Sequence, residues 1–336
     1  MSISKQEQRV SVWGAGSWGT ALAMVLAKHG RMVDLIARNA ETAQLLQQQR
    51  QNAKYLPDLM FPDSLQVVGQ DAADLTDILA QSTATVLALP CAAAEVALEK
   101  LASGKQPIIA ACKGINPKTL ERVDELLIRF VGESRTCLLS GPSFAAEVAM
   151  AKPTAITLAA ANHDFAHEVA MYFDDGNFRV YTSTDLVGVA LGGALKNIIA
   201  IAAGITEGLD LGHNALAALV TRGIAEISRL TVACGGQPET MSGLSGLGDL
   251  LLTCTGSLSR NRQMGMALAS GLDVKAARVQ VGQVVEGEKT AAAAVQLAKL
   301  HKIEMPITHM VYAVLSGQTS PEKAVQALLS RPERQE

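Results

Sequence analysis

Two patterns of apolar and polar residues divide the chain. In the first half, apolar runs of strand length alternate with helical stretches, which is typical of a parallel sheet with crossover helices. The predicted strands are 9–14, 32–37, 85–90, 107–112, 136–140, 154–160 and 178–182, and the predicted helices between them include 17–30, 40–51 and 91–102. The sequence therefore predicts an α/β domain at the N-terminal end.

After Asp185 the pattern becomes helical, with no convincing strand. Helices are predicted at 186–206, 213–235, 260–270, 287–301, 306–316 and 320–330. A chain of 336 residues is longer than one hydrophobic core usually organises. We expect an α/β domain over 1–187 and an all-helical domain over 188–336, with the boundary near 185–190.

The apolar run 186–206 has the length of a membrane span, about 20 residues. It contains six glycines or polar residues and one charged side chain, Lys196, near its middle. A lysine is expensive in hydrocarbon, and no second span or positively charged flank accompanies this one. A buried helix is the better interpretation, and its lysine is either a structural ion-pair partner or a group held out of water for chemistry.

Composition narrows the class of protein. The net charge of −3 offers no basic field for nucleic acid or anionic lipid. The five cysteines are widely spread and form no CxxC pair, so neither a disulfide framework nor a zinc knuckle is expected. His163 and His167 share a helical face but lack a third ligand, so no metal site is predicted. The N-terminus is polar and shows no signal region, which favours the cytoplasm.

The loop GAGSWG follows the first predicted strand and opens a helix. Gly14, Gly16 and Gly19 have G-x-G-x-x-G spacing, in which the glycines permit a tight turn, close approach to a pyrophosphate and packing of helix on strand. The helix N-terminus would offer amide donors to the phosphates. The context predicts a Rossmann-type dinucleotide-binding domain; a purely structural turn is the alternative.

Arg38 follows the second predicted strand, at the position that separates NAD from NADP. An acidic residue there would bind the ribose hydroxyls, whereas arginine suits a 2′-phosphate. Asp34 lies too early, inside the strand, and Glu41 comes later. The position is compatible with NADP, unless Arg38 is only a solvated surface residue.

Two further strand ends carry candidate ligand-binding groups. Lys113 ends a strand in AACKGIN, and ligands bind at the carboxyl ends of strands in open α/β sheets. In SGPSFAAEV, Gly141 and Ser143 stand at a strand-to-helix turn that suits capping or an anion. A surface lysine and a simple cap are the alternatives.

Two features of the helical half suggest a substrate site. Asp249 is the only charge between Glu239 and Arg260, and a buried acid needs a partner such as Lys196, unless it merely caps the next turn. The turn Ser259-Arg260-Asn261-Arg262 opens a helix, and guanidinium donors there suit a phosphate monoester. An exposed basic turn is the competing interpretation.

Together these stretches resemble the bacterial NAD(P)-dependent glycerol-3-phosphate dehydrogenase family. The matching segments run through nearly the whole chain: GAGSWGTALA at 14–23, CKG at 112–114, SGPSFAAE at 140–147, GGALKNIIAIAAG at 192–204, GLGDLLLTC at 246–254, SRNRQMG at 259–265 and QVVEG at 283–287. The resemblance implies a 6-phosphogluconate-dehydrogenase-like fold, NADP(H) or NAD(H) as cofactor, and a homodimer. It also implies reversible reduction of dihydroxyacetone phosphate to sn-glycerol 3-phosphate, which supplies phospholipid synthesis.

The resemblance also implies roles for individual residues. Lys196 matches the proton donor and acceptor. Substrate-contacting positions are Lys113, Gly141, Ser143, Lys196, Asp249, Ser259, Arg260 and Asn261. Cofactor-contacting positions are Gly14, Gly16, Ser17, Trp18, Gly19, Arg38, Lys113, Ala145, Arg260, Val284 and Glu286.

The expected chemistry centres on Lys196. A free lysine has a pKa of about 10.4, too high for a base at neutral pH. Burial and a second cation such as Lys113 favour the neutral amine, whereas Asp249 favours the ammonium. Gly192 and Gly193 are expected to leave room beside the lysine for a small substrate. A related dehydrogenase of a β-hydroxyacid and a catalytically silent nucleotide-binding protein are the alternatives.

Overall fold

The computed structural model describes residues 8–173, 176–282 and 285–332, and its contacts divide the chain into two compact units. The first unit comprises Met1–Lys113 and Val123–Val189, and the second comprises Gly114–Arg122 and Ala190–Glu336. This division falls slightly after the predicted boundary at 187/188. It also assigns a short segment that follows Lys113 to the second unit, which the sequence did not suggest.

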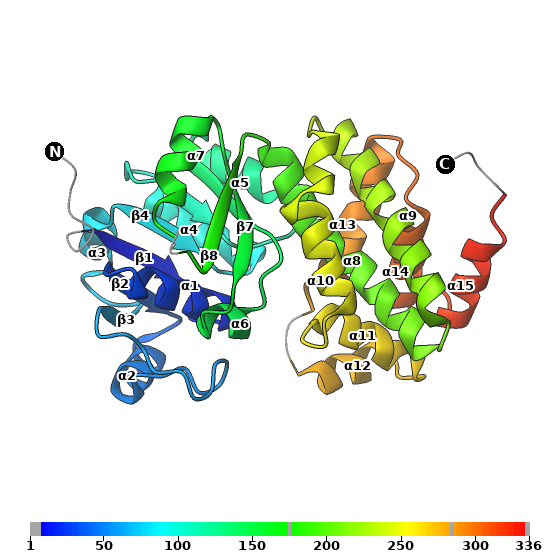
Figure 1. Ribbon diagram of the computed structural model, residues 1–336, viewed down its shortest axis with the longest axis horizontal. Coiled ribbons are helices and arrows are strands. Elements are labelled where there is room, and N and C mark those ends of the chain that lie inside the picture. The colour runs from blue at the N-terminus through cyan, green and yellow to red at the C-terminus, as the bar shows by residue number, and fades with distance from the viewer. Residues whose placement is uncertain (1–7, 174–175, 283–284, 333–336) are drawn as a thin grey trace. The chain divides into compact units, whose positions relative to one another are not determined.

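The first unit contains an eight-stranded sheet of order β3-β2-β1-β4-β5-β6-β7-β8 (Figure 1). All neighbours pair in parallel except β6 and β7, which are antiparallel. The strands are β1 (Arg9–Trp13), β2 (Met32–Ala37), β3 (Leu65–Gly69), β4 (Ala84–Leu87), β5 (Ile108–Ala110), β6 (Thr136–Ser140), β7 (Thr154–Ala160) and β8 (Phe178–Ser183). The order reverses between β1 and β4, and such switch points hold ligands at the carboxyl ends of the strands.

Helices connect and cover this sheet, as predicted for a Rossmann-type domain. They are α1 (Ser17–Lys28), α2 (Ala40–Gln49), α3 (Leu75–Gln81), α4 (Cys91–Leu101), α5 (Val123–Val131), α6 (Ala145–Ala149) and α7 (His163–Ala170). Helix α1 is buried from Gly19 to Ala27, and its apolar side chains join those of β1 and β2 in one core. The core fixes the start of α1, and with it the glycine loop, at the switch point.

The second unit is helical throughout its described regular elements. It is built from α8 (Leu186–Gly208), which begins just before the division, α9 (Gly212–Ala233), α10 (Asp249–Thr255), α11 (Arg260–Ala269), α12 (Val274–Val281), α13 (Glu286–Leu300), α14 (Pro306–Leu315) and α15 (Pro321–Leu329). A 3₁₀ turn (Pro238–Ser242) and a π-helical turn (Leu244–Gly248) precede α10. The predicted fold class, an α/β domain followed by a helical one, is confirmed.

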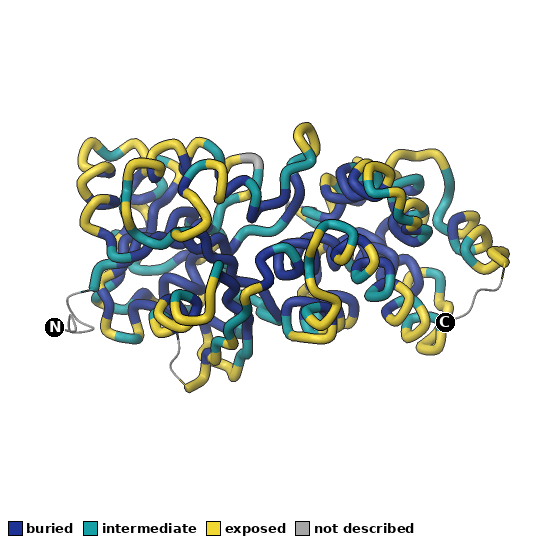
Figure 2. Tube along the Cα trace, turned by 90° about the horizontal axis from the view of Figure 1, so that it is seen from above, coloured by how far each residue is buried: buried dark blue, intermediate teal, exposed yellow. Residues whose placement is uncertain are grey.

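Helix α8 is the apolar run that resembled a membrane span. Its most apolar 18-residue window has a mean hydropathy of 1.9, and 89% of that window is buried inside the protein. In Figure 2 the buried stretches of the trace lie inside each unit, whereas outer turns are exposed. The burial favours the interpretation of α8 as a core helix.

Glu226 of α9 stabilises the start of α14. The residue is 2% exposed, and its carboxylate accepts hydrogen bonds from Ile307 N at 2.7 Å and Thr308 N at 3.3 Å. Met305, the N-cap residue of α14, provides no side-chain cap, so Glu226 satisfies N–H groups that would otherwise be left without acceptors.

Replacement of Glu226 by alanine is expected to lower the free energy of unfolding by about 3 kcal/mol, because two buried N–H groups lose their acceptor. Burial raises the pKa of Glu226, against the opposing effect of its backbone hydrogen bonds. The folded state therefore binds the proton more tightly than the unfolded chain. The free energy of unfolding of the wild type therefore falls as pH rises through the raised pKa. The difference in this free energy between wild type and Glu226→Ala becomes smaller over the same pH range. Urea titrations at several pH values measure this; Glu226→Gln, which keeps one acceptor, should lose less.

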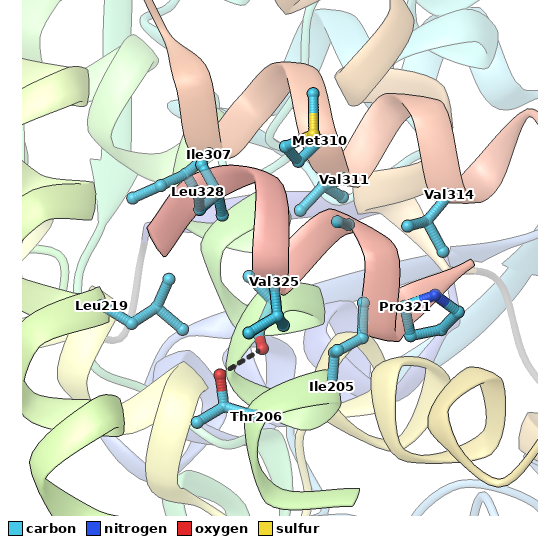
Figure 3. Close-up of a pocket in the computed structure, with 12 residues that line it drawn as sticks. Ile205, Thr206, Leu219, Ile307, Met310, Val311, Val314, Pro321, Val325 and Leu328 are labelled. Atoms are coloured by element: carbon cyan, nitrogen blue, oxygen red, sulfur yellow. Dashed lines mark hydrogen bonds between the residues drawn. The ribbon is translucent and has the colours of Figure 1, made fainter. Parts of the chain in front are cut away.

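A small apolar cavity of about 40 Å³ lies between α8, α9, α14 and α15 (Figure 3). Ile205 of α8, Val311 of α14 and Val325 of α15 are among its lining residues. None of the described residues that line it is charged or a histidine, so these residues offer no group for acid–base chemistry. Ile205 also lies nine residues beyond Lys196, or about 13 Å along the helix axis. The cavity is therefore separate from the candidate site.

Candidate functional site

The glycine loop between β1 and α1 is built as the sequence predicted. Gly14 has φ +120°, and a Cβ there would lie 2.6 Å from the carbonyl oxygen of Ala88. A Cβ on Gly19 would lie 1.9 Å from the carbonyl oxygen of Gly14. Any larger residue at either position would push the loop away from β4 or from its own helix. Both glycines are required by the close packing of this turn.

Gly16, unlike Gly14 and Gly19, has open space beside its Cα. A Cβ built on it meets nothing within 4 Å, so packing within the described protein does not require glycine there. Gly16 is also the N-cap of the 12-residue helix α1, with no side-chain cap and no acidic residue in the first turn. An open backbone at an uncapped helix N-terminus, at the sheet's switch point, fits a dinucleotide pyrophosphate.

Arg38 follows β2 directly and is exposed at the carboxyl end of the strand. The next residue, Asn39, caps α2 by accepting a hydrogen bond from Thr42 N at 2.9 Å. Asp34 is buried in the middle of β2, where Arg9 Nη2 donates to its carboxylate at 2.8 Å. Asp34 is thus committed to an internal ion pair, and arginine is the charged residue at the end of β2.

Other predicted residues of the first unit also lie near carboxyl ends of strands. Lys113 follows β5 and is half-buried. Gly141 follows β6, and the hydroxyl of Ser143 donates to the Gly141 carbonyl at 3.0 Å. Ala145 is the first residue of the short helix α6. Because β5 and β6 are parallel neighbours, these groups lie at the carboxyl ends of the strands. The glycine loop after β1 and Arg38 after β2 lie at the same end of the sheet.

Lys196 is buried in α8, and its predicted partner is confirmed. The side chain is 9% exposed, and its Nζ donates to the carboxylate of Asp249, which is 2% exposed. Nζ also donates to the hydroxyl of Thr253 at 2.9 Å, and this hydroxyl in turn donates to the Asp249 carbonyl at 2.6 Å. The lysine is therefore a buried ammonium held by a carboxylate and a hydroxyl, both from α10.

The pairing depends on a close approach between α8 and the turn before α10. A Cβ on Gly192 would lie 2.6 Å from the carbonyl oxygen of Ser245, inside the π-helical turn Leu244–Gly248. Gly192 therefore lets the turn pack directly on α8, one helical turn before Lys196. The expectation that Gly192 leaves room for substrate is wrong, because backbone occupies that space.

Asn197, next to Lys196, links three helices of the second unit. Its Nδ2 donates to Glu286 at the start of α13 at 3.2 Å, and its Oδ1 accepts from Asn261 Nδ2 at 2.9 Å. Asn261 Oδ1 in turn accepts from the backbone N–H of Gly287 at 3.0 Å. The predicted site residues Asn261 and Glu286 are thereby connected to the turn of α8 that carries the lysine.

The predicted SRNR turn opens α11, and its two arginines differ. Ser259 is the N-cap and accepts a hydrogen bond from Arg262 N at 3.3 Å. Arg262 donates through Nε to Glu207 at 2.7 Å, with a second bond from Nη2 to the same carboxylate. Arg260 is an exposed residue in the first turn. Arg262 is thus engaged with Glu207 of α8, and the contact of Arg260 with a substrate phosphate stays a prediction.

Thr253 and Asn197 were not predicted as site residues. Thr253 follows Asp249 at the i, i+4 spacing that puts two residues on one helix face, a signal that could have identified it. Asn197 carries no comparable signal besides its position beside Lys196. Val284, predicted to contact the cofactor, lies outside the described residues.

The two buried cysteines, Cys254 and Cys137, are not activated. Cys254, next to Thr253, is 1% exposed, and burial raises the pKa of its thiol to about 12. Burial likewise raises the pKa of the Cys137 thiol in β6. Thiols with such pKa values are inert at neutral pH, so neither residue is a nucleophile. Among the described residues, no group of three His, Cys, Asp or Glu side chains could hold a metal ion.

Comparisons with known proteins identify the family of the chain. The chain matches the model of the NAD-dependent glycerol-3-phosphate dehydrogenase N-terminus over residues 9–166 and that of its C-terminus over residues 185–326. It is 46% identical to glycerol-3-phosphate dehydrogenase [NAD(P)+] of Halorhodospira halophila over 97% of this chain and 98% of that protein. It is 45% identical to the Nitrosomonas eutropha protein of the same name, over 96% and 97% of the two chains.

A solved structure extends the similarity to three dimensions. The crystal structure of glycerol-3-phosphate dehydrogenase from Coxiella burnetii superposes with a TM-score of 0.91 at 40% identity. The match covers 97% of this chain and 100% of the other. Both units therefore match the corresponding parts of glycerol-3-phosphate dehydrogenases, and the chain belongs to the NAD-dependent glycerol-3-phosphate dehydrogenase family.

Proposed function

We propose that this protein is an NAD(P)-dependent sn-glycerol-3-phosphate dehydrogenase that reversibly reduces dihydroxyacetone phosphate. The observation that carries the proposal is the buried Lys196, held by Asp249 and Thr253 in the helical unit. A buried ammonium with a carboxylate partner is suited to donate a proton to an oxygen that gains negative charge. The similarity to dehydrogenases of that name supports the choice of substrate.

Each part of the site has a defined task in this reaction. Bound NAD(P)H would supply the hydride for C2 of the substrate. The Lys196 ammonium polarises the ketone, donates its proton to the forming alkoxide, and accepts it back in the oxidising direction. Asp249 and Thr253 hold Nζ in one position, so that little reorganisation is needed when the proton moves.

The proposed ligand contacts follow the family pattern. For the substrate they are Lys113, Gly141, Ser143, Lys196, Asp249, Ser259, Arg260 and Asn261. For the cofactor they are Gly14, Gly16, Ser17, Trp18, Gly19, Arg38, Lys113, Ala145, Arg260, Val284 and Glu286. The open backbone at Gly16 supports the pyrophosphate assignment, and the exposed residue Arg260 at the start of α11 supports the phosphate assignment.

The setting of the reaction is part of the proposal. We infer a cytoplasmic homodimer whose product, sn-glycerol 3-phosphate, supplies glycerophospholipid synthesis. Size-exclusion chromatography with light scattering measures the oligomeric state directly.

The direct test follows NADPH oxidation by absorbance with dihydroxyacetone phosphate or a β-ketoacid as acceptor. Turnover with dihydroxyacetone phosphate is expected. Turnover with the β-ketoacid alone would instead identify a β-hydroxyacid dehydrogenase, and binding of NADPH without turnover of either would identify a nucleotide-binding protein.

Arg38→Asp is expected to shift cofactor preference from NADPH toward NADH. The carboxylate can accept hydrogen bonds from the ribose hydroxyls and repels a 2′-phosphate. Because the charge-assisted contact between arginine and the 2′-phosphate is lost, the ratio of kcat/KM for NADPH to kcat/KM for NADH is expected to fall on the order of 30-fold. Steady-state kinetics with both cofactors measure the ratio, and an unchanged ratio would make Arg38 a surface residue only.

Arg260→Ala is expected to raise the KM for dihydroxyacetone phosphate on the order of 30-fold, because a charge-assisted contact to phosphate is lost. Arg262→Ala is the matched control from the same turn, since its guanidinium is bound to Glu207. The control should lower thermal stability and leave this KM within about twofold, the range expected when no ligand contact is removed. Equal KM effects in both variants would contradict a specific role for Arg260.

A further inference from the structure

Asn52 lies outside the glycine motif and contacts it directly. The residue is 3% exposed, in the segment after α2. Its Nδ2 donates to the carbonyl oxygen of Ala15 at 3.1 Å and to the hydroxyl of Thr20 at 2.9 Å. A side-chain amide nitrogen has two hydrogens, so one is used by the turn between β1 and α1 and the other by the first turns of α1.

The bond to Ala15 fixes the direction of one peptide group. Carbonyl and N–H point in opposite directions across a planar trans peptide. When Asn52 holds the Ala15 carbonyl, it therefore sets the direction of the Gly16 N–H, which points away from Asn52. The next peptide is set separately, because Thr20 N donates to the Gly16 carbonyl at 2.9 Å. Gly16 is the residue whose Cβ position is open, at the uncapped start of α1.

Asn52 is held in place by its own segment. Its carbonyl accepts hydrogen bonds from Tyr55 N at 3.1 Å and Leu56 N at 2.8 Å. Arg50 closes the segment by donating to the carbonyls of Leu65 at 2.7 Å and Pro62 at 2.6 Å. Leu56 is buried in the same core as α1. The segment thus forms a rigid support for the Asn52 amide.

We propose that Asn52 is a positioning residue for the dinucleotide. It aims the Gly16 amide at the pyrophosphate before the cofactor arrives, so that binding does not have to order this peptide. The inference rests on the proposed function in so far as the ligand is NADPH or NADH. Asn52 acts through Ala15 and Gly16 and does not itself touch the cofactor.

The test measures NADPH affinity by fluorescence titration without substrate. Asn52→Leu, which keeps the side-chain volume, and Asn52→Ala are expected to raise the NADPH dissociation constant on the order of 10-fold, as expected for one lost hydrogen bond that orients a ligand contact. In turnover assays the KM for NADPH should rise similarly, whereas kcat at saturating NADPH should stay within about twofold, because Lys196 is untouched.

Two controls separate positioning from stability. Thr20→Val removes the second acceptor of Asn52 and keeps the bond to Ala15, so it should lower the melting temperature with little change in affinity. Gln106→Ala removes a similar hydrogen bond, from a side-chain amide to the Leu79 carbonyl at 3.2 Å. Gln106 precedes β5 and so lies at the amino ends of the strands, away from the glycine loop. This variant should also leave NADPH affinity unchanged.

The outcomes distinguish the two proposals. If Thr20→Val or Gln106→Ala weakens NADPH binding as much as the Asn52 variants do, or if the Asn52 variants bind normally, the positioning role is overturned. If wild-type protein binds NADPH but does not reduce dihydroxyacetone phosphate, the proposed substrate fails while the Asn52 comparison still stands. If it binds neither NADPH nor NADH, both proposals fail.

Discussion

Lys196→Met is expected to lower kcat for dihydroxyacetone phosphate reduction by about 10²–10⁴-fold, the contribution typical of a positioned general acid. Lys196 is not among the proposed cofactor contacts, so the NADPH dissociation constant should stay close to that of wild type. Stopped-flow or steady-state absorbance measures the first quantity, and fluorescence titration the second. Near-normal turnover would exclude Lys196 as the proton donor.

The same substitution leaves the buried Asp249 carboxylate without its lysine, which is expected to destabilise the fold. Lys196→Met combined with Asp249→Asn removes both charges and should recover much of the lost stability. The double variant should remain inactive. Recovery of turnover together with stability would mean that Lys196 acts only through the fold.

Asp249→Asn alone is expected to lower the free energy of unfolding by about 3–5 kcal/mol, because it leaves a buried ammonium without its counter-charge. Loss of the carboxylate also favours the neutral amine. The reducing direction needs the protonated lysine, so its rate should begin to fall at a lower pH than in wild type. Chemical denaturation and kcat–pH profiles measure the two effects.

Glu226→Ala is the matched control for this pH effect. It also removes a buried carboxylate of the helical unit. Within the described residues, Glu226 accepts hydrogen bonds from backbone N–H groups of α14 and not from Lys196. The control should be destabilised while its kcat–pH profile keeps the wild-type shape. A profile displaced equally in both variants would trace the effect to general destabilisation.

Local patterns in the sequence predicted most of the sheet, the glycine turn and the long helices. Strand β3 was missed because LQVVG is short, only partly apolar and placed at the sheet edge, where one neighbour pairs with it. Helices α10 and α12 were also not predicted as separate elements. Their sequences are short and lie between turns, so helical periodicity has little room to appear.

The candidate site shows the same limit in finer detail. A lone lysine and a lone acid in apolar surroundings sufficed to predict the pair Lys196 and Asp249, because neither charge can stay buried alone. Gly192 was misjudged because sequence does not show whether a ligand or a neighbouring backbone fills the space beside a glycine. Asn52 was invisible for a related reason, since its bond to Ala15 joins segments 37 residues apart.

The assignment of Gly114–Arg122 to the second unit has a consequence for how the protein can be divided. The chain passes between the units after Lys113, after Arg122 and after Val189, so neither unit is one uninterrupted stretch of sequence. Ile115 in this segment is 3% exposed in the whole protein. A chimaera that joins the first half of this enzyme to the second half of a relative at one junction would therefore carry the segment into a foreign helical unit. Exchange of Gly114–Arg122 along with the helices would keep each core intact.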